Sequence, residues 1–324
     1  MTTDPSAQAI GVDLGGTKML VGVVDGSPQV LHRSEAGSLG RSSEELLVSL
    51  ESELREARAA CPEAASIGLG IPCTIDREHG IALGAVNLPL VDVPIRDIVA
   101  ESLEMPVFVD NDANVAALAE HRFGAARGAT NAILLTIGTG IGGGIIINGE
   151  VYRGTTGAAA ELGHLVIDQD GPRCQGNCPN HGCVESLASG TALGREGRAA
   201  AEKNPDSALG KALAAGEEID GRLVTEAGLD GDGTAVGVLD LIGTRIGVAL
   251  SSLSNVFEPD VLVIGGGVMA AGELLLEPAR AELKVRALRP NRETPVLAAE
   301  LGPQAGMIGA ATTAREECAG LRVA

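Results

Sequence analysis

Residues 10–18 read IGVDLGGTK, and an apolar stretch, MLVGVV, follows at 19–24 before an Asp-Gly pair at 25–26. Apolar residues run up to a glycine pair, resume for a second strand and stop at a turn, which predicts a β-hairpin with a widened glycine corner. Residues 132–149 repeat this pattern, with AILLTI before GTG at 138–140 and a second apolar run that Asn-Gly closes. Two copies of one hairpin predict an internal duplication, in which each half begins with this unit.

Both glycine corners have the composition of a phosphate-binding turn. Glycine lets backbone N–H groups approach an anion closely, and Thr17 and Thr139 add hydroxyl donors. Two such corners facing each other would grip a triphosphate from both sides, whereas the alternative is a pair of tight turns without a ligand. Asp13, at the end of its strand, is expected to hold Mg²⁺ directly or through water.

A third glycine cluster, Gly265–Gly267, lies between a buried type of strand at 260–264 and a run of helical composition at 268–287. A strand, a glycine turn and a helix N-terminus form a suitable place for the ribose and α-phosphate of a nucleotide. Close packing of the helix on the strand explains these glycines nearly as well.

An acidic and amide-rich sequence, DNDAN, occupies residues 110–114 between an expected strand at 105–109 and an expected helix from 115. Asp and Asn at such a junction are commonly helix N-caps. Two acids and two amides exceed what capping needs, and a carboxylate at a strand end can remove a proton from an alcohol while amides bind other hydroxyls. The junction is therefore a candidate for general-base chemistry, with capping as the alternative.

The composition excludes several classes of protein. The 324 residues suit two domains, and 45% hydrophobic residues are enough for sizeable cores. The net charge of −19 argues against a nucleic-acid partner, because phosphate contacts need a basic face. The first residues have no signal-peptide pattern and no apolar run of about twenty residues occurs, so we expect a cytoplasmic protein without a membrane partner. The six cysteines are expected to be thiols or metal ligands rather than disulfides.

These motifs, with GTGIGGG at 138–144, ELGH at 161–164 and GCVE at 182–185, resemble the ROK family of bacterial sugar kinases and sugar-responsive repressors. The resemblance covers nearly the whole chain. It implies an α/β fold of the actin-like, ribonuclease-H-like kind, with two duplicated domains and a sugar cleft between them. We expect a small domain of residues 1–120 plus 308–324, the latter a returning helix, and a large domain of residues 121–307.

The resemblance implies ATP-dependent phosphorylation of a hexose, with Mg²⁺. Asp112 resembles the base that deprotonates the sugar hydroxyl, usually O6, for in-line attack on the γ-phosphoryl group. The implied sugar ligands are Asn111, Asp112, Glu161, His164 and Glu185. The nucleotide-binding residues expected from the glycine turns and the resemblance are Asp13, Gly15, Gly16, Thr17, Lys18, Gly138, Thr139, Gly140, Gly265, Gly266 and Gly267.

Several substrates and functions stay open at this point. Glucose is the leading substrate because it is the commonest in similar members, while N-acetylglucosamine, mannose, fructose or allose as acceptor and polyphosphate as donor are alternatives. A repressor would need a helix-turn-helix domain before the kinase-like body, and only nine residues precede Ile10. A sugar sensor without catalysis would lack the base that Asp112 supplies. A homodimer or homotetramer is expected from the family.

A cysteine cluster follows His164. One imidazole and three thiolates make a closed tetrahedral zinc site of the structural kind, and the resemblance assigns its ligands as His164, Cys174, Cys178 and Cys183. His181 is a chemically plausible rival, and a disulfide with a spare thiol is the alternative to a metal. With one ring nitrogen on zinc, the histidine can direct the other to a sugar hydroxyl.

The chain departs from the family pattern at three places. Cys174 and Cys178 are separated by two more residues than usual, which changes the geometry of the zinc loop. Cys73 stands near the sugar position where glycine is common, and it can narrow the pocket. Ala160 precedes Glu161 where glycine is frequent.

Overall fold

The computed structural model describes residues 7–85 and 87–321, and the chain divides into two compact units. The first unit comprises residues 1–128, 144–160 and 301–324, and the second comprises 129–143 and 161–300. The expected large domain also included residues 121–128 and 301–307, which group with the first unit, and residues 144–160. These residues group with the first unit because they pack on its helices: a Cβ at Gly144 would lie 2.8 Å from the carbonyl oxygen of Ala113.

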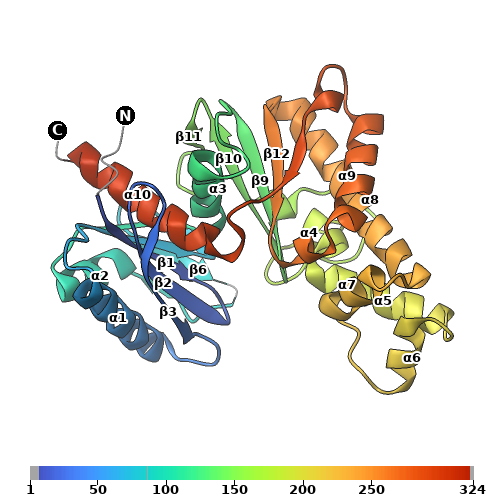
Figure 1. The fold of residues 1–324 in the computed structure, drawn as a ribbon, viewed down its shortest axis with the longest axis horizontal. Helices are drawn as coiled ribbons and strands as arrows, with labels where there is room; N and C mark the ends of the chain where they lie inside the picture. The colour runs from blue at the N-terminus through green and yellow to red at the C-terminus, as the bar shows by residue number, and fades with distance from the viewer. Residues whose placement is uncertain (1–6, 86, 322–324) are drawn as a thin grey trace. The chain divides into compact units, whose positions relative to one another are not determined.

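The first unit is built on a five-stranded sheet in the order β3-β2-β1-β4-β8 (Figure 1). Its strands are β1 (Ala9–Leu14), β2 (Lys18–Val24), β3 (Val30–Gly37), β4 (Ile67–Ile71) and β8 (Val107–Asn111). The pairs β1–β2 and β2–β3 are antiparallel, whereas β1–β4 and β4–β8 are parallel. The first hairpin that the sequence predicted is therefore confirmed, with Gly15 to Thr17 at its corner.

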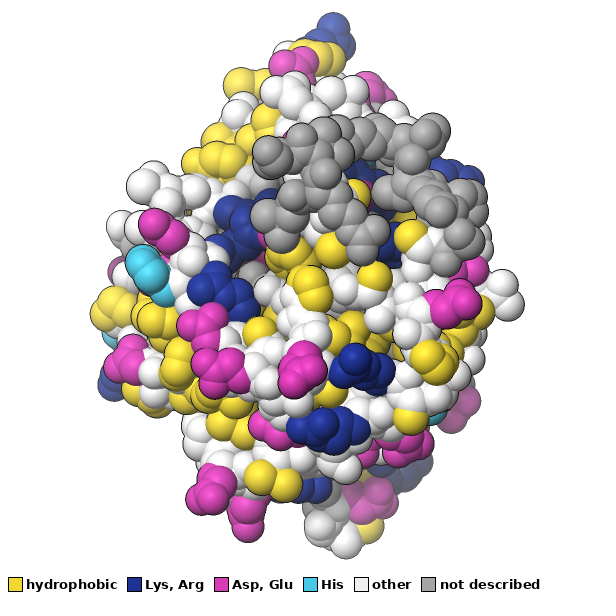
Figure 2. All heavy atoms as spheres, turned by 90° about the vertical axis from the view of Figure 1, so that its left-hand side faces the viewer, with side chains coloured by type: hydrophobic (Ala, Val, Ile, Leu, Met, Phe, Trp, Pro, Cys, Tyr) yellow, Lys and Arg dark blue, Asp and Glu magenta, His cyan; other side chains and the backbone are white. Residues whose placement is uncertain are grey.

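Four helices and a small sheet also belong to this unit: α1 (Ser43–Ala60), α2 (Ile95–Leu103), α3 (Asp112–Phe123), α10 (Ala305–Leu321), and β5 (Cys73–Asp76), β6 (Ile81–Ala85) and β7 (Val91–Val93). A capping box starts α1, in which the Ser42 side chain accepts from the Glu45 N–H and the Glu45 carboxylate accepts from the Ser42 N–H. On the face in Figure 2, acidic and basic side chains are interspersed with apolar ones.

Helix α10 lies across the first sheet, where glycines let it approach the strands closely (Figure 1). A Cβ at Gly11 would lie 2.0 Å from the carbonyl oxygen of Met307, and one at Gly68 would lie 1.9 Å from that of Ala310. Any larger residue would therefore push the helix off the sheet. The expected return of a final helix to the first domain is thus observed.

The second sheet has the order β11-β10-β9-β12-β13. Its strands are β9 (Ala132–Ile137), β10 (Ile141–Ile147), β11 (Glu150–Val151), β12 (Val261–Gly265) and β13 (Val296–Ala298). Strand β12 is parallel to both β9 and β13. The second predicted hairpin is β9–β10, so both sheets contain the same kind of hairpin. The duplicated, actin-like α/β fold is confirmed.

The helices of the second unit are α4 (Val184–Ala188), α5 (Gly190–Lys203), α6 (Ala208–Ala214), α7 (Gly221–Leu229), α8 (Gly233–Phe257) and α9 (Glu273–Arg286). The run expected to be helical from 268 forms a short 3-10 turn at Gly267–Ala271 first, and α9 begins only at Glu273. The break is at Gly272, whose φ of 55° leaves the helical region.

Helix α8 is long and apolar enough by composition to cross a membrane, and it is alone in this among the helices described. It packs against α9, α7 and α5, and buries 56% of its most apolar window inside the protein. These contacts are those of a core helix of the second unit.

Candidate functional site

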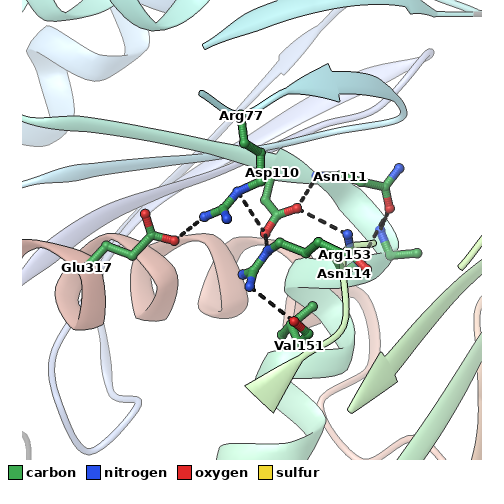
Figure 3. A network of polar contacts seen from close by, with 8 residues as sticks. Arg77, Asp110, Asn111, Asn114, Val151, Arg153 and Glu317 are labelled. Atoms are coloured by element: carbon green, nitrogen blue, oxygen red, sulfur yellow. Dashed lines mark hydrogen bonds and ion pairs between the residues drawn. The ribbon is translucent and has the colours of Figure 1, made fainter. Parts of the chain in front are cut away.

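The junction of β8 and α3 positions the candidate base at a helix start. Asn111 is the N-cap, because its Oδ1 accepts hydrogen bonds from the N–H groups of Ala113 at 2.9 Å and Asn114 at 3.2 Å. Its amide nitrogen points away from the helix (Figure 3). Asp112 is the first helical residue and is half-buried, with Oδ1 2.9 Å from the Ala113 nitrogen. The capping role that competed with catalysis therefore belongs to Asn111.

The other acid of this junction, Asp110, is buried and forms ion pairs. Only 2% of it is exposed, and it accepts from Arg153 Nε at 2.7 Å and from Asn114 Nδ2 at 3.1 Å. Arg77 Nε lies 3.8 Å away (Figure 3). Reasoning from the sequence missed both arginines, because neither is near Asp110 in the chain.

A second carboxylate interacts electrostatically with Asp112. Burial, and after it the charge of Asp112, raises the pKa of Asp13 to about 7, while Lys18 acts in the opposite direction. Two neighbouring carboxylates at strand ends are the oxygen ligands that a divalent cation prefers. The neighbouring Cys73 is buried, and its burial together with the Asp112 charge raises the pKa of the thiol to about 12. The Cys73 thiol therefore stays neutral, and it contributes packing beside Asp112 rather than a nucleophile.

The first glycine corner is held by backbone hydrogen bonds and one hydroxyl. The Thr17 carbonyl accepts from the N–H groups of Ser38 at 3.0 Å and Leu39 at 3.4 Å. Gly15 N–H donates to the Lys18 carbonyl at 2.9 Å, and the Ser38 hydroxyl donates to the Gly15 carbonyl at 2.5 Å. Thr17 is exposed, and the exposed Lys18 pairs with Glu35 at 3.1 Å. A surface pair of this kind adds little stability, so the Lys18 ammonium can change partners easily.

The second glycine corner is held by helix α5. Gly138 N–H donates to the Gly140 carbonyl at 2.9 Å, and the Gly138 carbonyl accepts from Gly190 N–H at 2.7 Å. The Thr191 hydroxyl donates to the Thr139 carbonyl at 2.8 Å. These bonds fix the carbonyl groups of the corner.

Glu185 braces the same corner from the other side. Its Oε2 accepts from Ile141 N–H at 2.8 Å, and a Cβ added to Gly140 would lie 2.4 Å from that oxygen. A larger residue at position 140 would therefore displace the Glu185 carboxylate from its bond to Ile141. The third predicted turn lies beside it, since a Cβ on Gly266 would lie 2.3 Å from the carbonyl oxygen of Ile137. The structure thus brings together the nucleotide-binding residues predicted in the second unit.

Four potential metal ligands converge in the second unit: His164, Cys174, Cys178 and Cys183, whose ligand atoms all lie within 4.8 Å of one another. Cys174 Sγ is 3.5 Å from His164 Nδ1, and the sulfurs of Cys178 and Cys183 are 3.9 Å apart. These separations fit a tetrahedral ion with bonds of about 2.0 to 2.3 Å, and they are too long for a disulfide.

His181, the rival ligand, is exposed and lies apart from the four, with Nδ1 3.4 Å from the Gly171 carbonyl. Burial first, together with the neighbouring thiols, raises the pKa of Cys174 above its usual range, and burial likewise raises that of Cys183. These raised pKa values favour the neutral thiols, whereas a bound cation would favour the thiolates. The donor set therefore fits zinc.

The predicted sugar ligands of the second unit gather around this cluster. Glu161 lies within electrostatic reach of His164 and Glu185. Glu185 Oε1 is also 3.9 Å from Cys174 Sγ. Two carboxylates and an imidazole at one place offer acceptors and a donor to a polyhydroxylated ligand.

The sequence profile of the ROK family matches residues 9–317. The glucokinase of Thermotoga maritima is 35% identical over 98% of this chain and 100% of its own length. The glucokinase of Streptomyces coelicolor is also 35% identical, over 95% of this chain and 97% of its own. A solved structure of a ROK family glucokinase from Streptomyces griseus in complex with glucose and AMPPNP is 35% identical, with a TM-score of 0.85 over 96% of this chain and all of the other.

Proposed function

The chain belongs to the ROK family, and we propose that it is an ATP-dependent hexose kinase that phosphorylates glucose at O6. The observation that carries this proposal is the junction of β8 and α3. Asn111 supplies the helix cap, and Asp112 follows it as the first helical residue, where its carboxylate interacts electrostatically with a second acid, Asp13. Similarity to glucokinases along the full length supports glucose as the acceptor.

In the proposed reaction Asp112 accepts the proton of the sugar O6 hydroxyl as that oxygen attacks the γ-phosphorus of ATP in line. The bond from the γ-phosphorus to the β–γ bridging oxygen breaks, and ADP leaves. General-base help of this kind contributes about 10² to 10⁴ in rate. Phosphoryl transfer needs positioning and charge neutralisation more than covalent chemistry. Asp13 would hold the Mg²⁺ that accompanies ATP, since a carboxylate whose charged form is disfavoured alone gains most from a cation.

The nucleotide would be bound by the glycine turns. We assign the triphosphate to Gly15–Lys18 and Gly138–Gly140, and the ribose and α-phosphate to Gly265–Gly267. Support comes from the second corner, where hydrogen bonds to the carbonyls and to Glu185 fix the backbone in advance, as N–H donors to a phosphate require. For the sugar we assign Asn111, Asp112, Glu161, His164 and Glu185, and the amide nitrogen of Asn111 remains available to donate because its oxygen is the cap.

We also propose a structural zinc ion on His164, Cys174, Cys178 and Cys183. When bound, it would close the loop and fix the orientation of His164 toward the sugar. Elemental analysis should find about one zinc per chain, a Cys178→Ser variant should lose it and a His181→Ala variant should keep it. Zinc loss is expected to raise the KM for glucose. Full sugar affinity in protein stripped of metal would contradict the role.

The family resemblance further supports a role in glycolysis, a cytoplasmic location and a homodimeric or homotetrameric assembly.

The test of the main proposal is ADP release measured against glucose, mannose, fructose, allose and N-acetylglucosamine, with ATP or polyphosphate as donor. Glucose with ATP should give the highest kcat/KM. If none of these sugars stimulates ADP release, the proposed function is wrong.

A further inference from the structure

One carboxylate at the head of α3 has no part in the proposed chemistry. Asp110 is 2% exposed, and a buried charge is stable only when it is paired and hydrogen-bonded. Two arginines neutralise it, with Arg153 Nε at 2.7 Å and Arg77 Nε at 3.8 Å. Arg77 is itself engaged by Glu317 of α10, so that Arg153 makes the short, direct contact (Figure 3).

One oxygen of Asp110 accepts two hydrogen bonds from the chain around the candidate base. Its Oδ1 accepts from the backbone N–H of Asn111 at 2.9 Å and from Asn114 Nδ2 at 3.1 Å. Asp112 lies between these two residues. The carboxylate of Asp110 therefore sets the direction in which the first turn of α3 leaves the strand.

Arg153 comes from the segment that leads to Glu161. Its Nη1 donates to the Val151 carbonyl at 3.3 Å, and its own carbonyl accepts from Ala159 N–H at 3.2 Å. The loop from Arg153 to Ala160 is thereby closed on itself and fastened to Asp110 by one side chain. This loop belongs to the same compact unit as Asp110.

We propose that Arg153 is a positioning residue for Asp112: by neutralising Asp110 it keeps the turn of Asn111 and Asp112 in its reactive orientation. The role of Asp112 in this proposal rests on the proposed kinase function. Removing Arg153 would leave Asp110 buried, charged and without its closest partner. The turn of Asn111 and Asp112 would then shift so that water can solvate the Asp110 carboxylate. A displacement of about 1 Å at a base can cost about a hundredfold in rate.

The test compares Arg153→Gln with Arg122→Gln. Arg122 is a matched control from the same unit, because its side chain is 23% exposed against 21% for Arg153, and its Nε lies 2.7 Å from Glu316. Arg153→Gln should lower kcat by about 10- to 100-fold while the KM for ATP changes by less than about twofold. Arg122→Gln should lower thermal stability by a similar amount and leave kcat unchanged.

A double variant, Asp110→Asn with Arg153→Gln, makes the test independent of a folding failure. It removes the uncompensated charge while the amide oxygen still accepts from Asn111 and Asn114, so it should recover at least about tenfold of the lost kcat. Equal loss of stability in both single variants with kcat intact in Arg153→Gln would overturn the proposal. An absence of recovery in the double variant would also overturn it.

Amide hydrogen exchange without substrate separates this inference from the kinase function. Exchange at Ala113 and Asn114 should be faster in Arg153→Gln than in the unmodified protein or in Arg122→Gln. Unchanged exchange there refutes the positioning even if the protein is an active kinase. Faster exchange in a protein without kinase activity would support the positioning of the turn and refute the proposed function instead.

Discussion

The β1–β2 hairpin carries Asp13 two residues before its first corner glycine, whereas the β9–β10 hairpin carries Thr136 at the same place before Gly138. Their corners also differ in support. The first is held by the Ser38 hydroxyl and by the backbone N–H groups of Ser38 and Leu39, while α5 and Glu185 hold the second. Two copies of one hairpin have thus diverged. The first carries the carboxylate of Asp13, whose charged form is disfavoured by burial, and the second has a backbone that Glu185 holds in place.

This division has a physical reason. When burial disfavours the charged form of a carboxylate in the empty site, a bound cation stabilises that charged form strongly, because little water screens the pair. Backbone N–H donors stabilise a transferring phosphoryl group best if they need not reorganise, so the backbone that carries them must be held in place beforehand. The predictions that follow test this contrast, from the largest expected effect to the smallest.

The largest effect is expected from Asp112→Asn, which removes the proposed base that interacts with Asp13 of the first hairpin. We expect kcat to fall by about 10³-fold with little change in thermal stability, since Asn111 supplies the helix cap. Steady-state ADP release would measure it, with Asp97→Asn on the surface of α2 as the control. A kcat within about tenfold of the unmodified protein would assign the base elsewhere.

A smaller effect is expected in the pH dependence of stability. The pKa of Asp13 is raised from 3.8 to about 7 by burial first and by Asp112, so the folded state binds a proton that the unfolded state has lost between these values. Stability is therefore highest below pH 4 for this group, falls as pH rises through that window, and is lower by up to about 4 kcal/mol above pH 7.

Thermal unfolding without Mg²⁺ between pH 5 and 8 measures this dependence. The melting temperature should fall as pH rises, and Asp13→Asn should flatten the curve. Thr136→Val, at the matching place of the other hairpin, should leave the slope unchanged. A slope that survives in Asp13→Asn would mean that another group causes it.

A third prediction concerns the braced corner. Gly140→Ala places a methyl group against Glu185 Oε2 and should break its bond to Ile141, lowering the free energy of unfolding by about 1 to 3 kcal/mol. Gly138→Ala is the matched control, because a Cβ there meets nothing within 4 Å. Equal stability of the two variants, measured by urea denaturation, would show that the corner is not braced.

The smallest effect is expected at Ala160, which joins the two units in sequence. Its φ of 66° lies in the left-handed region, where a side chain costs about 1 kcal/mol. Ala160→Gly should therefore raise the stability to urea by up to about 1 kcal/mol. Ala159→Gly, one residue earlier, should lower it, and the same sign in both variants would contradict the assignment of strain.

Features coded by neighbouring residues were predictable from the sequence. The two hairpins follow from local apolar and glycine patterns, and the structure contains both. The capping alternative at residues 110–114 could not be settled from the pattern, because Asn111 and Asp112 are both good caps. In the structure it is Asn111 whose side chain takes the role.

Features that depend on distant partners were not predictable. Asp110 and Arg153 are 43 residues apart in the chain, and Glu185 and Ile141 are 44 apart, so no local pattern marks either pair. The place of residues 144–160 was missed for the same reason, since it depends on packing against α3. Ala160 stood out only as a departure from the family, and its positive φ gives that departure a physical meaning.

The close fit of α10 against Gly11 and Gly68 has a consequence for the order in which the molecule is made. During synthesis the ribosome completes β1 and β4 early, but it produces α10 after every other helix and strand described. The first sheet therefore lacks the helix that packs against β1 and β4 at a time when the second unit, which includes no residue beyond 300, is already complete. We expect the nascent chain to acquire its units in reverse order, the later one in sequence first.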